Sequence, residues 1–293
     1  MIVFHLSMDL FQEIISKMAV VGKKFMFKQV SKKMSELKII HNNVFPVTNR
    51  RSFMKNFKLI KREHMLKKFV LYDVPSKIID LKHMHNLVHI KCVNFDNISL
   101  NIENLVKIEV NDYNGLIDKI QCHNMSKSLR ILNFHGGGRI QANISSIGLL
   151  TQLRELSIPG CKKIDQIKLM CSLNSLNINY IDACDLDIRH LVNLTRLSCS
   201  NVSKLSDLNT LTNLRILKMS HDCEVTNHGI KSLNVKELSI INNIRITDVR
   251  HMDKLKKLWA SGSVTMMSDE GLQGLKLDFV EAIMNPKITF KEA

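Results

Sequence analysis

Few residues of this chain have the types and spacing that catalysis requires. His135, Gly136, Gly137 and Gly138 form a run whose backbone N–H groups could face a developing negative charge, as an oxyanion-binding loop does. Such a loop serves a nucleophile, and the chain contains no Gly-x-Ser-x-Gly motif to supply one. Because the run directly follows an apolar, strand-like segment at 129–134, we interpret it as a turn.

The histidines and cysteines predict no metal site. His83 and His85 are close, but there is no His-Glu-x-x-His motif, and none of the seven Cys has Cys-x-x-Cys spacing. We therefore expect no catalytic residue, no metal and no cofactor. We interpret the cysteines as free thiols in a reducing compartment, cytoplasmic or nuclear, with Cys92 and Cys199 filling the core.

Composition indicates a globular protein with an unusual first quarter. Of the 293 residues, 45% are hydrophobic and 24% charged, and no run of about 18 apolar residues predicts a membrane span. The formal charge is +15, and residues 1–70 hold 15 basic residues against 4 acidic ones. We infer a separate N-terminal module. A nucleic-acid partner for this basic segment ranks last among the functions considered, because no aromatic-rich nucleic-acid motif accompanies the charge.

Self-similarity at a short period predicts the fold. Seven segments share the pattern apolar-x-x-apolar-x-apolar, with first residues 24, 20, 21, 20, 21 and 20 positions apart. They are 129–134, 153–158, 173–178, 194–199, 214–219, 235–240 and 255–260, and weaker copies after Leu66, Leu87, Leu105 and Leu277 bring the number to about eleven. Alternate residues of a strand face one side, so the second and third apolar residues of each copy point into one core. A second rhythm of period three, as in Leu208-x-x-Leu211-x-x-Leu214, is expected to close the back of each coil.

These repeats resemble leucine-rich repeats, LxxLxLxxN/C, over residues 66–293. The resemblance implies an α/β solenoid with a parallel sheet on its concave face and short, mostly non-helical convex segments. The N/C position departs from the pattern, because it holds Cys161 and Asn285 but also Gly137, Ile181 or Val202. We expect three parts: a helical module at 1–40, a basic helical connector at 41–65 with a helix between residues 52 and 64, and the repeat domain at 66–293.

Residues 6–37 resemble an F-box. The stretch LSMDLFQEIISKM and the later VSKKMSEL follow the family's two apolar blocks, although Ser7 replaces the usual Pro and Met34 the usual Trp. The resemblance implies that the matched apolar residues seat the module on the Skp adaptor of a cullin-RING ubiquitin ligase. These residues are Leu6, Leu10, Ile14, Ile15, Met18, Val30 and Met34.

We expect the variable positions of the repeats to form a basic concave face. They hold twelve basic residues, Lys67, Lys68, Lys91, Lys107, Arg130, Arg154, Arg196, Arg215, Lys218, Lys236, Lys256 and Lys257, against five acidic ones. We interpret Arg130, Arg154, Arg196, Arg215, Lys218, Lys236, Lys257 and the only Trp, Trp259, as target-binding. A C-terminal cap folded over Trp259 is the alternative.

The expected function is target recognition without catalysis. An F-box followed by leucine-rich repeats implies a substrate-recognition subunit of a cullin-RING ubiquitin ligase, whose repeats bind an acidic or phosphorylated segment of a protein and whose partners are the Skp adaptor and cullin. The alternative is a stand-alone leucine-rich repeat scaffold in which the N-terminal helices cap the first repeat.

Overall fold

The structure, a computed structural model, describes the repeat region and little else. The described residues are 44–47, 68–72, 79–80, 86–93, 98–99, 103–111, 126–135, 147–161 and 167–289. The chain divides into two compact units, Met1–Asn43 and Val44–Ala293, and every described residue belongs to the second. The F-box-like segment 6–37 and the helix expected between residues 52 and 64 lie outside the described residues.

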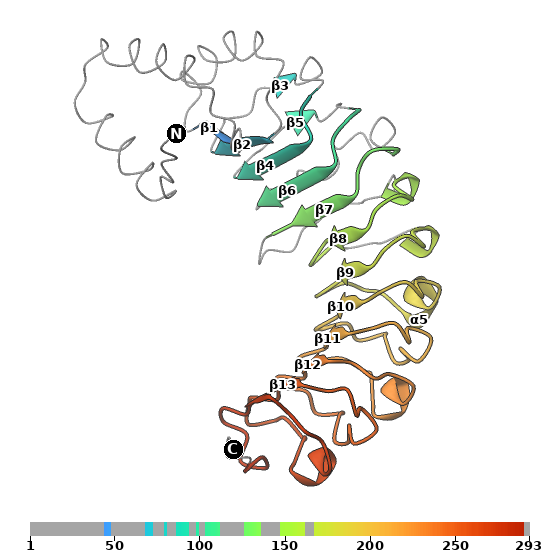
Figure 1. The fold of residues 1–293 in the computed structure, drawn as a ribbon, viewed down its shortest axis with the longest axis vertical. Helices are drawn as coiled ribbons and strands as arrows, with labels where there is room; N and C mark the ends of the chain where they lie inside the picture. The colour runs from blue at the N-terminus through green and yellow to red at the C-terminus, as the bar shows by residue number, and fades with distance from the viewer. Residues whose placement is uncertain are drawn as a thin grey trace, which may run out of the picture. The chain divides into compact units, whose positions relative to one another are not determined.

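Parallel strands stack in sequence order along one side of the coils, as the repeat period predicts (Figure 1). In the described part of the chain this sheet has twelve strands: β1 (Val44–Val47), β2 (Lys68–Tyr72), β4 (His89–Val93), β6 (Lys107–Asn111), β7 (Ile131–Phe134), β8 (Glu155–Ser157), β9 (Ser175–Asn177), β10 (Arg196–Ser198), β11 (Ile216–Lys218), β12 (Glu237–Ser239), β13 (Lys257–Trp259) and β14 (Phe279–Glu281). A separate pair joins β3 (Ile79–Asp80) to β5 (Ile98–Ser99), also in parallel.

The sheet begins earlier than residue 66, the start that we expected for the repeat domain. Strand β1 lies within the expected connector 41–65 and pairs in parallel with β2, Val44 beside Lys68 and Val47 beside Leu71. Pro46 lacks a backbone N–H, and a strand at the edge of a sheet tolerates this loss. The second compact unit accordingly starts at Val44.

The aliphatic core follows the repeat pattern. The central residue of each of the three-residue strands β8 to β13 is a Leu, and in register these residues form a row from Leu156 to Leu258. Leu197 and Leu217 are 1% and 0% exposed. A parallel sheet whose inner face is covered in this way gains stability from burial rather than from strand length.

Tight turns cover the side of the coils opposite the strands, which we call the convex side (Figure 1). Short helical segments occur there: η2 (Ile147–Leu149), η3 (Ile167–Leu169), α5 (Asp185–Ile188), η4 (His228–Ile230) and η5 (Glu270–Leu272). The expected period of three is confirmed at Leu208, Leu211 and Leu214, which are buried. Its cause is a pair of i to i−3 backbone hydrogen bonds, from Leu211 N to Leu208 O and from Leu214 N to Leu211 O.

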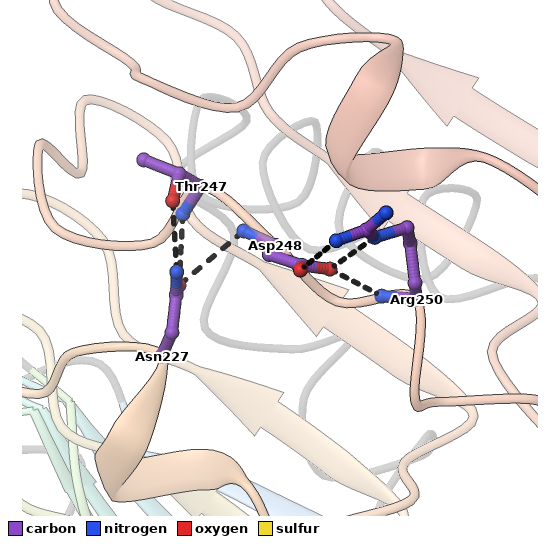
Figure 2. A network of polar contacts seen from close by, with 4 residues as sticks. All are labelled: Asn227, Thr247, Asp248 and Arg250. Atoms are coloured by element: carbon purple, nitrogen blue, oxygen red, sulfur yellow. Dashed lines mark hydrogen bonds and ion pairs between the residues drawn. The ribbon is translucent and has the colours of Figure 1, made fainter.

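Two kinds of coil alternate on the convex side from Asp185 onwards. In the first kind an Asp or Asn accepts hydrogen bonds from a Ser or Thr of the following coil; the pairs are Asp185 with Ser206, Asn227 with Thr247 and Asp269 with Thr289. Asn227 Oδ1 accepts from Thr247 N at 2.9 Å and Asn227 Nδ2 donates to Thr247 Oγ1 at 2.8 Å, while the adjacent Asp248 accepts from Arg250 (Figure 2).

The intervening coil interfaces use glycine instead. A Cβ on Gly229 would lie 2.1 Å from Ser206 O, and one on Gly271 would lie 1.9 Å from Thr247 O, so these two positions require the absence of a side chain. Leu208 N donates to Gly229 O across the same interface. Hydrogen-bonded and glycine-packed interfaces therefore follow each other in turn.

Candidate binding surface

The outward positions of the strands form two columns. The first column runs in register from His89 through Arg196 to Phe279, and the second runs from Lys91 through Lys218 to Glu281. We call these columns together the strand face. Among their described side chains, five are basic (Lys91, Lys107, Arg196, Lys218 and Lys257) and four are acidic (Glu109, Glu155, Glu237 and Glu281).

Half of the residues that we expected to bind the target lie beside these columns. Arg130, Arg154, Arg215 and Lys236 each lie one residue before their strand. The first variable residue of each repeat belongs to a separate row, which we call the edge row. In this row each backbone N–H donates to the carbonyl of the equivalent residue one coil earlier, as from Lys236 N to Arg215 O at 2.8 Å. The strand face itself is therefore close to neutral, and the expected basic excess is concentrated in the edge row.

Ionic contacts pair Glu109 with Lys107 and His89 in the early part of the strand face. Glu109 lies 2.7 Å from His89 Nε2 and 3.0 Å from Lys107 Nζ. Burial opposes ionisation of this carboxyl, but the hydrogen bonds from Lys107 and His89 outweigh it, and the pKa of Glu109 is lowered from 4.5. This group leaves little uncompensated charge for a ligand.

Small polar side chains satisfy one another in the middle of the second column. Asn177 Nδ2 donates to Ser157 Oγ at 3.1 Å, and Ser198 Oγ donates to Asn179 Oδ1 at 2.9 Å. Groups that are already paired in this way offer few free donors or acceptors. The middle of the strand face is therefore a weak candidate for ligand recognition.

Uncompensated charge collects on the coils of β10, β11 and β12. Arg196 and Lys218 belong to the two columns, and Arg215 and Lys236 to the edge row. Within the described part of the chain, all four side chains are exposed and none forms a hydrogen bond or ion pair. We call these four residues the cation cluster. Adjacent strands lie about 4.8 Å apart, so the cluster spans about 10 Å across the sheet.

An aromatic pair lies on the two coils that directly follow the cluster, those of β13 and β14. The rings of Trp259 and Phe279 are 5.4 Å apart between centroids and tilted by 48°. Trp259 is half-buried, and Phe279 is 36% exposed, so no cap covers the pair among the residues described through 289. A rigid, partly exposed aromatic surface is typical of binding hot spots.

The asparagine ladder of the repeats includes one residue that the sequence analysis missed. Asn243 is fully buried, and its side chain donates to Met219 O at 3.0 Å and accepts from Arg245 N and Ile246 N. Asn285, identified from the sequence, does the same for Ala260 O and Lys287 N. Asn243 could have been found from the sequence, because it stands eight residues after Val235, the first apolar residue of its repeat, and so occupies the N/C position of the pattern.

Other groups considered for chemistry show no site. Among the described residues no cluster of three or more His, Cys, Asp or Glu could hold a metal ion, and no helix is long and apolar enough to cross a bilayer. His135 is described and exposed, whereas Gly136–Gly138, His83 and His85 lie outside the described residues.

The cysteines that the structure describes with their side chains are free thiols. They are Cys161, Cys171, Cys184, Cys199 and Cys223. Cys161 and Cys199 are buried, and burial raises the pKa of Cys161 to about 12. A hydrogen bond with Cys223 and burial both raise the pKa of Cys199 well above its usual value. Cys199 therefore fills the core as a neutral thiol.

The residues expected to bind the adaptor lie outside the described part of the chain. They are Leu6, Leu10, Ile14, Ile15, Met18, Val30 and Met34. Their role stays a prediction from the sequence.

Solved structures with a similar fold include internalins of Listeria monocytogenes. An internalin (inlF) of strain 4b F2365 matches with a TM-score of 0.51 at 18% identity, over 75% of this chain and 69% of the internalin. Internalin C2 (inlC2) of the same strain gives 0.41 at 16% over 65% and 78%, and the functional domain of InlJ gives 0.48 at 18% over 80% and 52%. No protein-family model matches the chain, and no curated protein matches it in sequence. The likeness to inlF, together with the stacked parallel strands, shows that the chain contains a parallel-sheet solenoid of the leucine-rich-repeat type.

Proposed function

We propose that this chain is a non-catalytic recognition subunit of a cullin-RING ubiquitin ligase, whose strand face and edge row together bind an acidic or phosphorylated segment of a target protein. The observation that carries the target-binding part is the cation cluster: four exposed cations without partners, next to a partly exposed Trp. Such a subunit performs no chemistry. It acts by raising the effective concentration of the target near the ligase.

The adaptor-binding part rests on the sequence of residues 6–37 and on its position before the repeats. Helix-in-groove contacts concentrate their energy in a few apolar anchors. Ile14→Asp combined with Met18→Asp should therefore abolish co-purification with a Skp adaptor while the solenoid keeps its far-UV circular dichroism spectrum.

A matched variant controls for the added charge. Lys23→Asp with Lys24→Asp introduces two acidic residues in the same module at positions that the sequence predicts to be polar, and it should retain the adaptor. Absence of any adaptor from the wild-type protein, or equal retention by both variants, would contradict this part of the proposal.

The target-binding part is tested by charge reversal on opposite sides of the coils. The face-reversed variant carries Arg196→Glu, Arg215→Glu and Lys218→Glu. The convex-reversed variant carries the same change at three exposed cations of the convex turns, Lys168, Arg189 and Lys231.

Quantitative mass spectrometry of co-purified proteins should show partners lost only from the face-reversed variant. Loss of the same partners from the convex-reversed variant alone would contradict the proposed face.

A stand-alone interaction scaffold is the second candidate, favoured by the parallel-sheet solenoid, which needs no adaptor-binding module to present a binding surface. In that case the N-terminal helices cap the solenoid, and Leu10, Ile14, Ile15 and Met34 are buried in the isolated chain. In the ligase subunit these side chains are solvent-exposed until the adaptor binds. Cysteine substitution at Ile14 and Met34, followed by thiol labelling of the isolated protein, distinguishes the two: rapid labelling supports the ligase subunit and protection supports the scaffold.

A further inference from the structure

The cation cluster and the aromatic pair have a fixed separation. Lys218 and Trp259 belong to the second column, and Ser239 is the single residue between them. Two strand spacings of about 4.8 Å place their Cα atoms about 9.6 Å apart. A ligand that contacts both features must run across the strands, because the features lie on different coils.

The residue between the two features is small and already paired. Ser239 is 8% exposed, and its hydroxyl shares a hydrogen bond with Ser220 Oγ at 3.1 Å. This buried and paired hydroxyl gives a ligand little polar surface to recognise. The stretch of ligand above Ser239 is therefore unconstrained in sequence.

The strand face also offers no backbone hydrogen bonds to a ligand. The backbone groups of β10 to β13 are used in parallel pairing on both sides. A β-strand ligand needs such partners, whereas a polyproline II segment has none within itself and keeps its backbone solvated.

The distance between Lys218 and Trp259 also favours a polyproline II ligand. Side chains on one side of a polyproline II helix recur every three residues, or about 9.3 Å at 3.1 Å per residue. In a β-strand they recur every two residues, at about 6.6 Å. Of these two repeats, that of polyproline II is the one that matches the Cα distance of about 9.6 Å from Lys218 to Trp259.

We infer that the strand face reads an extended peptide motif in which an anionic residue and an apolar residue are separated by two others, anionic-x-x-apolar, with the peptide in polyproline II conformation across β10 to β14. The anionic side chain binds the cation cluster. The apolar side chain packs on Trp259 and Phe279. This motif rests on the target-binding role proposed above and specifies its chemistry. The anionic group is a carboxylate or a phosphate.

Synthetic peptides of defined spacing test the motif on the full chain. Fluorescent proline-rich peptides carry glutamate or phosphoserine and a leucine, separated by one, two or three prolines, in both chain orders. Fluorescence anisotropy should show at least about fivefold tighter binding for two intervening prolines than for one or three, in at least one chain order. The glutamate and phosphoserine arms identify which anion the cluster prefers.

Two variants assign the anchors. Trp259→Ala should remove the spacing preference and bring the best peptide to the affinity of the same peptide without its leucine. Tyr180→Ala, at an aromatic residue that is 63% exposed in the turn after β9, should leave the preference intact. Circular dichroism confirms folding of both variants, and Trp259→Phe should restore part of the preference if folding of Trp259→Ala is impaired.

The outcomes separate this motif from the function on which it rests. Equal affinity at all spacings, or a preference that survives Trp259→Ala, would overturn the motif and leave an acidic target standing. If the anionic peptides bind no more strongly than an uncharged peptide, both the motif and the acidic target would be overturned. Tighter binding of a single-stranded oligouridylate than of every peptide, unaffected by Trp259→Ala, would overturn both in favour of a nucleic-acid backbone.

Discussion

Replacing Asn243 by Ala should destabilise the C-terminal coils more than any exposed substitution. The Asn243 side chain makes three hydrogen bonds and is 0% exposed. Each bond contributes about 0.5–1.5 kcal/mol net, and the buried Met219 carbonyl and Ile246 N–H would lose their partner without gaining water. We expect the free energy of unfolding to fall by about 3–5 kcal/mol.

Asn213→Ala is the matched control. Asn213 is exposed and donates one hydrogen bond, to Val192 O at 2.9 Å, so its removal should cost less than about 1 kcal/mol. Urea unfolding of both variants gives the difference, and amide hydrogen exchange should show the loss of protection centred on the coils of β11 to β13, because each coil of a solenoid contacts only its neighbours. A cost below about 1 kcal/mol for Asn243→Ala, or one equal to that of Asn213→Ala, would refute the structural role assigned to the ladder.

Three further perturbations test the core, an ionic group and the binding face. Leu197→Ala and Leu217→Ala should each cost about 2–5 kcal/mol in urea unfolding, and a cost below about 1 kcal/mol at both would contradict the repeat register. Because the pKa of Glu109 lies below 4.5, its ionised form stabilises the fold above that pH and the contribution is lost as the pH falls further. Glu109→Gln should flatten the dependence of the free energy of unfolding on pH in this acidic range. An unchanged dependence in acid titration would argue against the ionic group. In fluorescence anisotropy, the face-reversed variant should bind a glutamate-rich peptide at least tenfold more weakly, and its affinity should depend less on salt concentration. Trp259→Ala should weaken binding without changing this salt dependence. An equal salt dependence for the wild type and the face-reversed variant would locate the anion site elsewhere.

The repeat period predicted the sheet and the core because both depend on the same alternation. Apart from β1, each strand of the twelve-stranded sheet lies where a copy of the repeat placed it, as β10 does after Leu194 and β11 after Leu214. Strand β1 was missed, since VFPV contains a Pro and is not part of a full copy of the repeat, and the two-residue strands β3 and β5 were missed because they contain no copy of the pattern. Local pattern therefore identifies a strand only where the whole coil repeats.

The binding face could be predicted only in part, for a geometric reason. The sequence analysis treated all variable residues of a repeat as equivalent, although Arg215 lies in the edge row and Lys218 in the second column. Exposure and charge were visible in the sequence, but the pairing that compensates Lys257 with Glu237 at 3.2 Å depends on which residues share a column. The cation cluster consists of cations that such pairing leaves uncompensated. Pairing depends on the register across coils, which is a property of the folded chain.

The alternation of convex interfaces sets the step by which such a chain can gain or lose repeats. Asp185, Asn227 and Asp269 are each 42 residues apart, or two coils. Deleting one Ser- or Thr-bearing coil would bring two acceptor coils together, so that the Asp or Asn would lose its hydrogen-bond donor and the glycine would lose the carbonyl on which it packs. Deleting or duplicating two coils restores both interfaces. Duplication would then lengthen the strand face by two strands at a time, about 9.6 Å, so each such event would add room for one more turn of a polyproline II ligand.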